Sequence, residues 1–380
     1  MRYVKIKEVA EVIMGQSPDS NSYNDKGIGI PFFQGKSEFG KINPIIKMYC
    51  TEPKKTAQPL DILMSVRAPV GDVNISNIDC CIGRGLCSIR SKENINYKYL
   101  YYYLLTQKKN LENQSTGSTF KAINKNIILD IEIPITDIET QNKIVEVLDK
   151  AQDLIDKKIE QIDLLDELVK SRFIEMFGNP ISNPKGWKKM TLNDISMKKG
   201  EYGSGESAVE YKENYPRYIR ITDIDDNGKL NNSKMTVNNL DEYEKYKLND
   251  GDILLARTGA TVGKTFLYKE VYGKCLFAGY LIRFIPNKDI INPEFLFAFT
   301  KTDFYKSWIK SKQNVVAQPN INAKQYGSLE IPIPPIELQN EFAVFVEKID
   351  SIKAAAEKSL EQLNYNFNSL MQKAFKGELF

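Results

Sequence analysis

Two stretches of this 380-residue sequence have residue types at spacings that could do chemistry on their own. The first, Gly259-Ala-Thr-Val-Gly-Lys-Thr265, resembles a P-loop, in which backbone amides and a lysine hold the phosphates of a nucleotide. The full pattern requires a glycine where this chain has Thr258. The next residues, Phe266-Leu-Tyr268, predict a strand rather than the helix whose N-terminus would bind phosphate. A tight turn between two strands is therefore the favoured interpretation.

The second stretch, Asn292-Pro-Glu-Phe295, is similar to the catalytic Asn-Pro-Pro-Tyr/Phe loop of adenine methyltransferases. Its counterpart in the first half of the chain begins Asn96-Tyr97 without the proline, and no glycine-rich loop for S-adenosylmethionine precedes it. An asparagine N-cap with proline at the first helical position explains the stretch better. A stand-alone adenine-specific DNA methyltransferase is the enzyme alternative that this stretch leaves open.

The composition also argues against catalysis and metal binding within this chain. The sequence has no histidine, which removes Ser-His-Asp and Cys-His sites and histidine-ligated metals. Five cysteines without CxxC spacing indicate neither a disulfide framework nor a zinc site. We therefore expect no catalytic residue, no metal site and no cofactor here. No apolar stretch approaches the roughly 20 residues of a membrane span, so we expect no membrane partner and a cytoplasmic location.

Positive charge is concentrated in two parts of the chain. Residues 1–135 carry 18 Lys and Arg against 13 Asp and Glu, and residues 179–333 carry 23 against 18. The segments that follow them, 136–178 and 334–380, are acidic. Two basic units favour binding of a polyanion, and double-stranded DNA is the partner we expect.

Side chains suited to reading DNA lie on the loops between the expected strands. Arg and Lys contact phosphates or guanine edges, and Asn and Gln can pair with adenine edges. For any single residue, a solvated charge or a structural ion pair is the competing interpretation. The candidates are Gln34, Lys36, Lys41, Arg67 and Arg84 in the first unit, and Arg217, Arg220, Thr222, Arg257, Lys264, Gln318 and Asn320 in the second.

An internal repeat predicts the elements that must position these loops. Residues 131–178 and 329–376 superimpose without a gap at a constant offset, so that Gln141 falls on Gln339. Each copy follows a long stretch of different sequence. A segment used twice in this way predicts a two-part molecule with internal pseudo-twofold symmetry.

Within each copy the apolar residues follow a heptad, which predicts a helix of about 40 residues and about 60 Å at 1.5 Å per residue. Lys158 and Lys353 each interrupt the stripe once. Two helices with one seam each bury it most economically against one another, and we expect an antiparallel coiled coil. The expected seam residues are Leu148, Ile155, Ile162, Leu165 and Val169 in the first copy, and Val346, Ile349, Leu360, Leu363, Phe367 and Leu370 in the second.

Short β-branched runs separated by Gly and Asn-Asp turns predict that the two globular units are mostly β, with a few short helices. The expected class is α+β: two mostly β units joined by two long helices. The expected segments are a first globular unit, a first helical spacer, a second globular unit and a second helical spacer, with boundaries 1–135, 136–178, 179–333 and 334–380.

This organisation resembles the specificity subunit of type I restriction-modification systems. The motifs that carry the resemblance are Asp61-Ile-Leu-Met-Ser-Val-Arg-Ala-Pro-Val-Gly71, Gly251-Asp-Ile-Leu-Leu-Ala-Arg-Thr-Gly-Ala-Thr-Val-Gly263, and Ile331-Pro-Ile-Pro-Pro335 followed by Glu337-Leu-Gln339. The resemblance covers essentially the whole chain.

The resemblance implies that the globular units are target recognition domains, each reading one half of a bipartite DNA site. The helices would act as a spacer and dock two methyltransferase subunits, and restriction subunits would join that core. S-adenosylmethionine, ATP and Mg²⁺ would then belong to the partner subunits. A coiled-coil scaffold that does not bind DNA is the remaining alternative.

Overall fold

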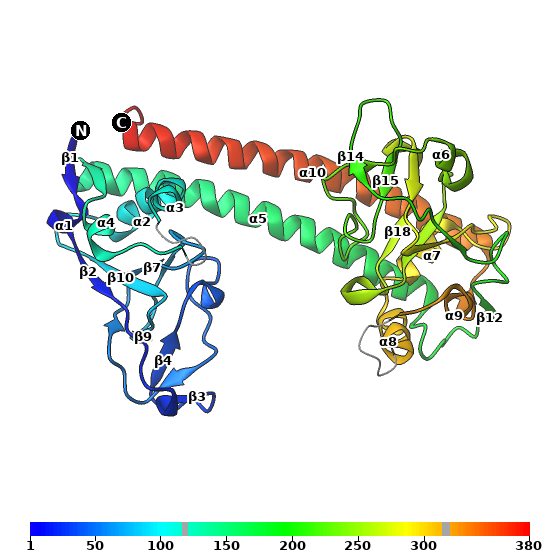
Figure 1. Ribbon diagram of the computed structural model, residues 1–380, viewed down its shortest axis with the longest axis horizontal. Coiled ribbons are helices and arrows are strands. Elements are labelled where there is room, and N and C mark those ends of the chain that lie inside the picture. The colour runs from blue at the N-terminus through cyan, green and yellow to red at the C-terminus, as the bar shows by residue number, and fades with distance from the viewer. Residues whose placement is uncertain (116–120, 314–319) are drawn as a thin grey trace. The chain divides into compact units, whose positions relative to one another are not determined.

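The computed structural model describes residues 1–115, 121–313 and 320–380. By their contacts these residues form two compact units, and each unit contains part of both long helices (Figure 1). Unit 1 consists of Met1–Ile159 and Lys358–Phe380, and unit 2 of Glu160–Glu357.

Unit 1 is an α+β unit whose strands form three sheets. In chain order its elements are β1 (Arg2–Lys5), α1 (Ile6–Val9), β2 (Ala10–Met14), β3 (Tyr23–Asn24), β4 (Ile30–Phe33), β5 (Tyr49–Cys50), β6 (Thr56–Ala57), β7 (Ile62–Ser65), β8 (Val73–Ile75), β9 (Cys80–Ile82), β10 (Leu86–Ser91), α2 (Tyr97–Thr106), α3 (Lys108–Gln114), α4 (Lys125–Leu129), β11 (Glu132–Ile135) and the start of α5 (Ile138–Phe177). The sheet orders are β1-β11, β2-β10-β7-β8 and β3-β5-β4-β9-β6.

Unit 2 repeats much of this plan. Its elements are β12 (Lys188–Thr191), β13 (Glu201–Tyr202), β14 (Val209–Glu210), β15 (Arg217–Ile219), β16 (Met235–Thr236), α6 (Asp241–Tyr246), β17 (Ile253–Ala256), β18 (Thr265–Leu267), β19 (Cys275–Phe277), β20 (Leu281–Phe284), α7 (Pro293–Phe299), α8 (Asp303–Lys312), α9 (Ala323–Gly327), β21 (Glu330–Ile333) and the start of α10 (Ile336–Lys376). The sheet orders are β12-β21, β13-β20-β17-β18, β14-β16 and β15-β19.

The four-stranded sheets show the internal repeat most clearly. The order β2-β10-β7-β8 in unit 1 corresponds to β13-β20-β17-β18 in unit 2, and every pairing in both is antiparallel. Each unit also has a pair of parallel strands that correspond to one another: β4 with β9 in unit 1, and β15 with β19 in unit 2. The α+β class with two similar units is confirmed.

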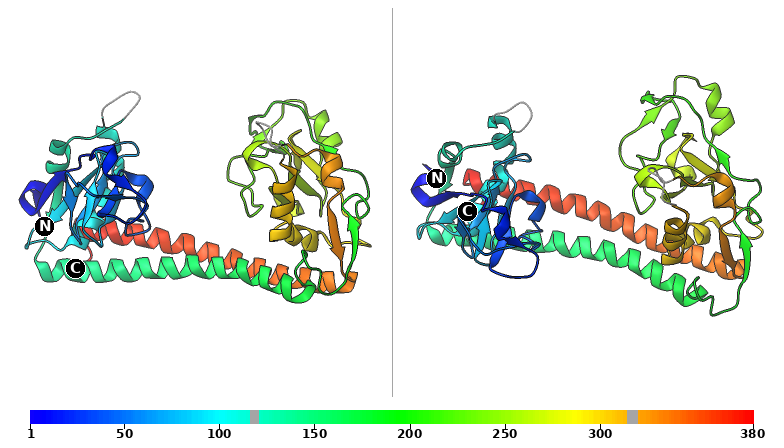
Figure 2. Two further views of the ribbon diagram at one scale, coloured as in Figure 1. Left: turned by 90° about the horizontal axis from the view of Figure 1, so that it is seen from below. Right: turned by 60° about the horizontal axis from the view of Figure 1, so that its bottom comes forward.

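The two long helices begin and end close to where the heptads place them, at Ile138–Phe177 and Ile336–Lys376. In unit 2, Asp166 pairs with Lys353 and Arg172 pairs with Glu341, so residue numbers rise along α5 as they fall along α10. The segments therefore run antiparallel. In both views of Figure 2 the two helix segments lie side by side within each unit.

The expected seam residues are buried or half-buried, and none of them is exposed. In unit 1 they join a core cluster with the strands and α2, where Phe375 packs against Tyr99 and Tyr103 with ring centroids 5.2 and 5.1 Å apart. In unit 1 the seam is therefore one side of the core as well as a contact between helices, and in unit 2 Val169 and Val346 join the core in the same way. Leu148, Ile155, Leu360, Leu363, Phe367 and Leu370 lie in unit 1, and Ile162, Leu165, Val169, Val346 and Ile349 lie in unit 2.

The strand before each long helix differs in one respect from what its proline suggests. A proline tends to end a strand because it has no N–H to donate, but Pro134 and Pro332 each lie inside the strand, paired with Tyr3 and Lys189 respectively. Each strand belongs to a two-stranded sheet, and an edge position tolerates a residue without an N–H.

A buried glutamine joins each long helix to the short helix beneath it. The Gln141 side chain accepts a hydrogen bond from the Asn96 amide (2.9 Å) and donates to the Thr136 carbonyl (2.9 Å). Gln339 does the same with the Asn292 amide (2.9 Å) and the Pro334 carbonyl (2.8 Å). Neither glutamine has any exposed surface. The repeat thus preserves a polar joint that fixes the N-termini of α2 and α7.

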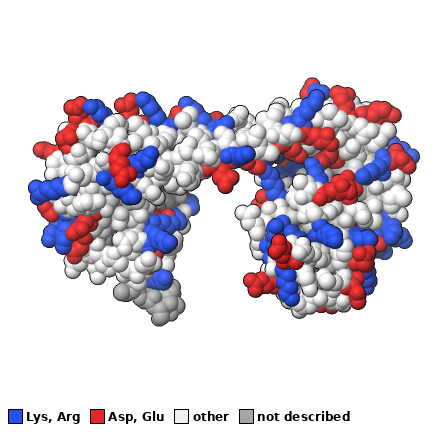
Figure 3. Space-filling model, turned by 90° about the horizontal axis from the view of Figure 1, so that it is seen from above, with Lys and Arg blue, Asp and Glu red and all other residues white. Residues whose placement is uncertain are grey.

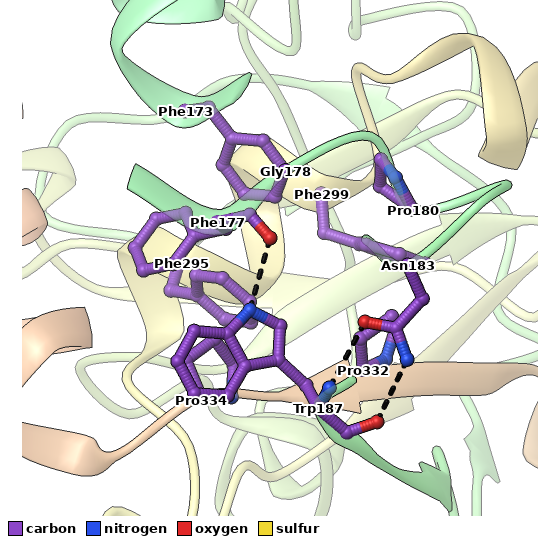
Figure 4. A pocket seen from close by; sticks show the side chains of 10 residues that line it. All are labelled: Phe173, Phe177, Gly178, Pro180, Asn183, Trp187, Phe295, Phe299, Pro332 and Pro334. Atoms are coloured by element: carbon purple, nitrogen blue, oxygen red, sulfur yellow. Dashed lines mark hydrogen bonds between the residues drawn. The ribbon is translucent and has the colours of Figure 1, made fainter. Parts of the chain in front are cut away.

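The segment 178–187, between α5 and β12, fixes the far end of α5. The indole nitrogen of Trp187 donates to the Phe177 carbonyl (2.9 Å), and Asn183 exchanges two hydrogen bonds with the Trp187 backbone. Figure 4 shows the aromatic and proline side chains that surround this joint. The cavity they leave is about 10 Å³, room for at most about one water molecule. The pocket therefore belongs to the packing that fixes the end of α5 and is too small for a ligand.

The buried Lys353 offers a test of how the helices keep their register. Lys353 is 7% exposed and pairs with Asp166, and it occupies the position that Ile155 has in the first repeat. We expect Lys353→Met to lower the free energy of unfolding by about 1–2 kcal/mol, because Asp166 is 36% exposed and water can solvate much of its charge. Urea titration of the purified chain measures this loss.

The double variant Lys353→Met with Asp166→Leu is the control. Replacing both partners of a buried pair by apolar residues is often neutral, so it should recover most of the stability. A double variant as unstable as the single one would contradict this account of the pair.

Within residues 1–115, 121–313 and 320–380, no helix is long and apolar enough to cross a membrane.

Candidate nucleic-acid interface

Three of the candidate residues in unit 1 are brought together where strands end. The Gly85 amide donates to the Gln34 carbonyl (3.2 Å), and the Val66 amide donates to the Gly85 carbonyl (2.9 Å). These bonds join the loop after β4, the β9–β10 turn and the loop after β7. Gln34, Arg84 and Arg67 therefore form one group, which we call the unit 1 loop cluster.

The unit 1 loop cluster is tightly packed around Gln34. A Cβ atom on Gly83 would lie 2.6 Å from the Gln34 side-chain oxygen, and one on Gly85 would lie 2.4 Å from the Gln34 carbonyl oxygen. The side-chain nitrogen of Gln34 donates to the Ser17 hydroxyl (3.1 Å), which also accepts from the Arg84 amide (3.2 Å). Glycine is required in this turn, and it lets the Arg84 and Gln34 loops touch. The Arg67 and Arg84 side chains are exposed.

The two candidate lysines of unit 1 are held by carboxylates. Lys36 lies 2.8 Å from Asp72, which also pairs with Lys108 at 2.7 Å. Burial raises the pKa of Asp72, but the hydrogen bonds from Lys108 and Lys36 outweigh it and leave the pKa below its ordinary value. Lys41 pairs with Asp156 of α5 at 2.7 Å. Both lysines thus hold the unit together, and their charge is partly neutralised.

The corresponding region of unit 2 contains Arg257 and Asn320. The Arg257 guanidinium lies 4.7 Å from the centre of the Tyr202 ring, and its Nε atom lies 3.5 Å from the Asn320 side-chain oxygen. The Arg257 amide donates to the Tyr280 carbonyl (3.1 Å). We call Tyr202, Arg257, Tyr280 and Asn320 the unit 2 loop cluster.

Backbone hydrogen bonds show that the two clusters are equivalent places in the repeat. Val66 bonds Gly85 and Ile123 in unit 1 as Arg257 bonds Tyr280 and Ile321 in unit 2. The matching position of Arg67, which bridges to Ala122, is therefore Thr258, which bridges to Asn320. The framework is shared, and the side chains it presents differ.

Two other candidates of unit 2 are tied to their own unit. Arg217 donates to the Asn231 and Ser233 carbonyls at 2.7 and 2.9 Å. Arg220 follows β15 as Gln34 follows β4, and the Asp223 carboxylate, 2.7 Å away, raises the pKa of its guanidinium. These two guanidinium groups are structural.

The remaining candidates of unit 2 give weaker evidence about contact with DNA. Lys264 pairs with Asp226 at 3.0 Å and donates to the Ile224 carbonyl (3.3 Å). Thr222 has an exposed side chain, and its carbonyl accepts from the Asn231 side chain (3.1 Å). Gln318 lies outside the described residues.

Two aromatic members of the unit 2 loop cluster were missed by the sequence reasoning. Tyr280 is 61% exposed and Tyr202 is 42% exposed, with its hydroxyl accepting from the Ala323 amide (3.1 Å). Tyr202 ends β13 and Tyr280 precedes β20, and tyrosine, with an apolar ring and a polar hydroxyl, is enriched at interfaces. The one available signal was the tyrosine flanked by glycines in Gly200-Glu-Tyr-Gly203, typical of a loop.

The charge on each unit is mixed. On the face that Figure 3 shows, Lys and Arg side chains alternate with Asp and Glu on both units, and no single basic surface stands out. On this face the positive charge is therefore interspersed with negative charge. Sequence-specific contacts would have to come from particular loop residues rather than from a broad basic face.

Both enzyme-like stretches have structural explanations. Asn292 caps α7, its side-chain oxygen accepting from the Glu294 amide (2.8 Å) and its nitrogen donating to Asn340 (2.9 Å). Asn96 caps α2 in the same way. Gly259–Thr261 forms a 3₁₀ turn and β18 follows at Thr265, which confirms the tight turn between strands.

Comparisons with known proteins independently support the resemblance found in the sequence. A sequence model of the type I restriction modification DNA specificity domain matches residues 1–164 and 184–365. The type I restriction enzyme EcoBI specificity subunit of Escherichia coli is 23% identical over 418 residues, covering 99% of this chain and 85% of that protein. The S subunit of a type I restriction-modification system from M. genitalium has a similar fold, with a TM-score of 0.56 at 16% identity, covering 98% of this chain and 96% of that one.

One relative is more similar over a shorter stretch. The putative type I restriction enzyme MjaX specificity subunit of Methanocaldococcus jannaschii is 49% identical over 135 residues. That match covers 35% of this chain and about a third (32%) of the relative's length.

Proposed function

The chain belongs to the type I restriction modification DNA specificity family, and from that premise we propose that each of its two units reads one half of a bipartite DNA site. The observation that carries the proposal is the pair of loop clusters: one backbone framework, used twice, presents Gln34, Arg67 and Arg84 in unit 1 but Arg257 and Asn320 in unit 2. A shared framework with different side chains suits two readers of different sequences.

We assign the chemistry to partner subunits. The relatives that share this family are named as specificity subunits, and both enzyme-like stretches here are structural. Two methyltransferase subunits would supply S-adenosylmethionine, and restriction subunits would supply ATP and Mg²⁺. This chain would contribute binding and orientation, and its DNA partner would place it in the cytoplasm.

The helices offer a basis for two equivalent docking places. Leu154 on α5 and Ile352 on α10 occupy the same position of the repeat and are 54% and 49% exposed. Exposed apolar side chains at matching positions fit two copies of one partner. We infer that each methyltransferase subunit covers one of them.

The test is DNA binding by the chain assembled with its methyltransferase subunits. We expect tight, sequence-selective binding to a bipartite site, with an affinity that falls steeply as salt rises because phosphate contacts release counterions. A competition assay at several salt concentrations, with a shuffled duplex as control, measures both properties. Equal affinity for both duplexes would overturn the proposal, and methyl transfer by the isolated chain would favour the methyltransferase alternative.

A further inference from the structure

Arg257 differs from the other arginines of unit 2 discussed above in how its guanidinium is held. One face lies against the Tyr202 ring, and only Nε is directed to the Asn320 oxygen. Within the described residues no hydrogen bond engages its two terminal nitrogens, whereas Arg217 and Arg220 use theirs on their own unit. Arg257 therefore keeps a donor pair for a ligand.

The backbone of Arg257 is fixed on both sides. Its amide donates to the Tyr280 carbonyl (3.1 Å), and its carbonyl accepts from the Ile321 amide (2.9 Å). The Tyr202 hydroxyl is in turn tied to the Ala323 amide. A side chain held in this way loses little further freedom on binding, which favours both affinity and selectivity.

The chemistry of the free donor pair identifies the ligand. Two parallel N–H groups on a planar guanidinium match the O6 and N7 acceptors at the major-groove edge of guanine. A phosphate could accept the same donors, but it would carry no sequence information. The exposed Tyr280 and Asn320 beside Arg257 form a polar and aromatic surface fit for a base edge.

We propose that Arg257 reads a guanine in the half-site of unit 2, with Tyr202 and Asn320 as positioning residues. This inference rests on the proposed function. It applies to unit 2 alone, because the equivalent position in unit 1 is Val66, which is 3% exposed and has no side-chain donor. The two half-sites therefore differ at the base that faces this point of the framework.

The experiment uses the chain assembled with its methyltransferase subunits and a DNA library with both half-sites randomised. Bound sequences are recovered and counted for the native chain and for Arg257→Lys, which keeps the charge but loses the planar fork. The native complex should prefer guanine at one position of the unit 2 half-site by roughly 10- to 100-fold. Arg257→Lys should reduce that preference to a few-fold and leave every other position unchanged.

Two further variants sharpen the result. Tyr202→Leu should weaken the same preference without moving it, because the ring only orients Arg257. Lys288→Gln is the matched control: it removes a 62% exposed charge beside Gly251, before the start of β17, whereas Arg257 follows the end of that strand. It should leave the preference intact.

The possible outcomes distinguish failure of this inference from failure of the proposed function. A uniform loss of binding by Arg257→Lys would show a phosphate contact, and an unchanged pattern would show no contact; either would overturn the inference. If the native complex selected no sequence in either half, the proposed function itself would fail. An intact preference in the unit 1 half-site verifies that each variant is folded and assembled.

Discussion

Exchanging unit 1 for the corresponding unit of a related specificity subunit is expected to replace one half of the recognised DNA sequence and leave the other half unchanged. The reason is that the unit 1 loop cluster is built from residues 1–135, and the backbone bonds that join its loops lie within unit 1. Mapping of methylated sites in cells that carry the native or the exchanged chain measures the effect. A change in both halves would contradict the assignment of one reader to each unit.

The contacts of α5 decide how the exchange should be designed. Lys98 and Tyr102 bind Asp149 at 2.5 and 2.7 Å, and Lys41 binds Asp156 at 2.7 Å. An exchange of residues 1–135 alone breaks these pairs wherever the relative differs. Moving 1–159 together with 358–380 keeps them, so this second chimera should show the same new half-site with higher stability. The reciprocal exchange of 179–333 is the control and should change the other half.

Replacing Gln339 by methionine is expected to destabilise unit 2 by about 3–5 kcal/mol. Methionine has a similar length but leaves the Asn292 amide and the Pro334 and Ile290 carbonyls without their partner. Each such buried group costs about 1–3 kcal/mol, and the sum is a large share of the 5–15 kcal/mol of a typical fold. Hydrogen exchange should locate the loss at the first turn of α7.

A matched variant separates this effect from that of methionine itself. Gln362 is exposed and its side chain donates to Asn366, four residues along α10, so Gln362→Met should change stability by a few tenths of a kcal/mol. Gln141→Met should reproduce the large loss in unit 1, with faster exchange in α2. Protection of α7 in Gln339→Met equal to that of the native chain would refute the role of the buried joint.

Patterns local to the sequence predicted the helices well. A heptad sustained over forty residues fixes both the type and the length of an element, and α5 and α10 begin and end close to where it places them. Asparagine caps before α2 and α7 were likewise readable, because a cap depends on neighbours two or three residues away. Proline was less reliable, since its effect in β11 and β21 depends on which strand edge faces a partner.

The loop clusters could be predicted only in part. Residue type singled out Arg257 and Asn320, but their contact joins positions 63 residues apart along the chain. Residue type also singled out Arg217 and Arg220, whose bonds to carbonyls and to Asp223 become visible only once the strands are folded. For Tyr202 the only signal was the neighbouring glycines, which say nothing of its contact with Arg257. Which charges are free is a property of tertiary packing, and a single sequence does not record it.

Unit 1 is built from two separate segments of the chain, and this affects how it folds during synthesis. Phe367 and Phe375, which pack on Tyr102, Tyr99 and Tyr103, are made more than 260 residues after those tyrosines. The unit synthesised first is therefore the one completed last, whereas unit 2 ends at Glu357. Until the last turns of α10 have been synthesised, the apolar side chains of unit 1 that these two phenylalanines cover remain exposed.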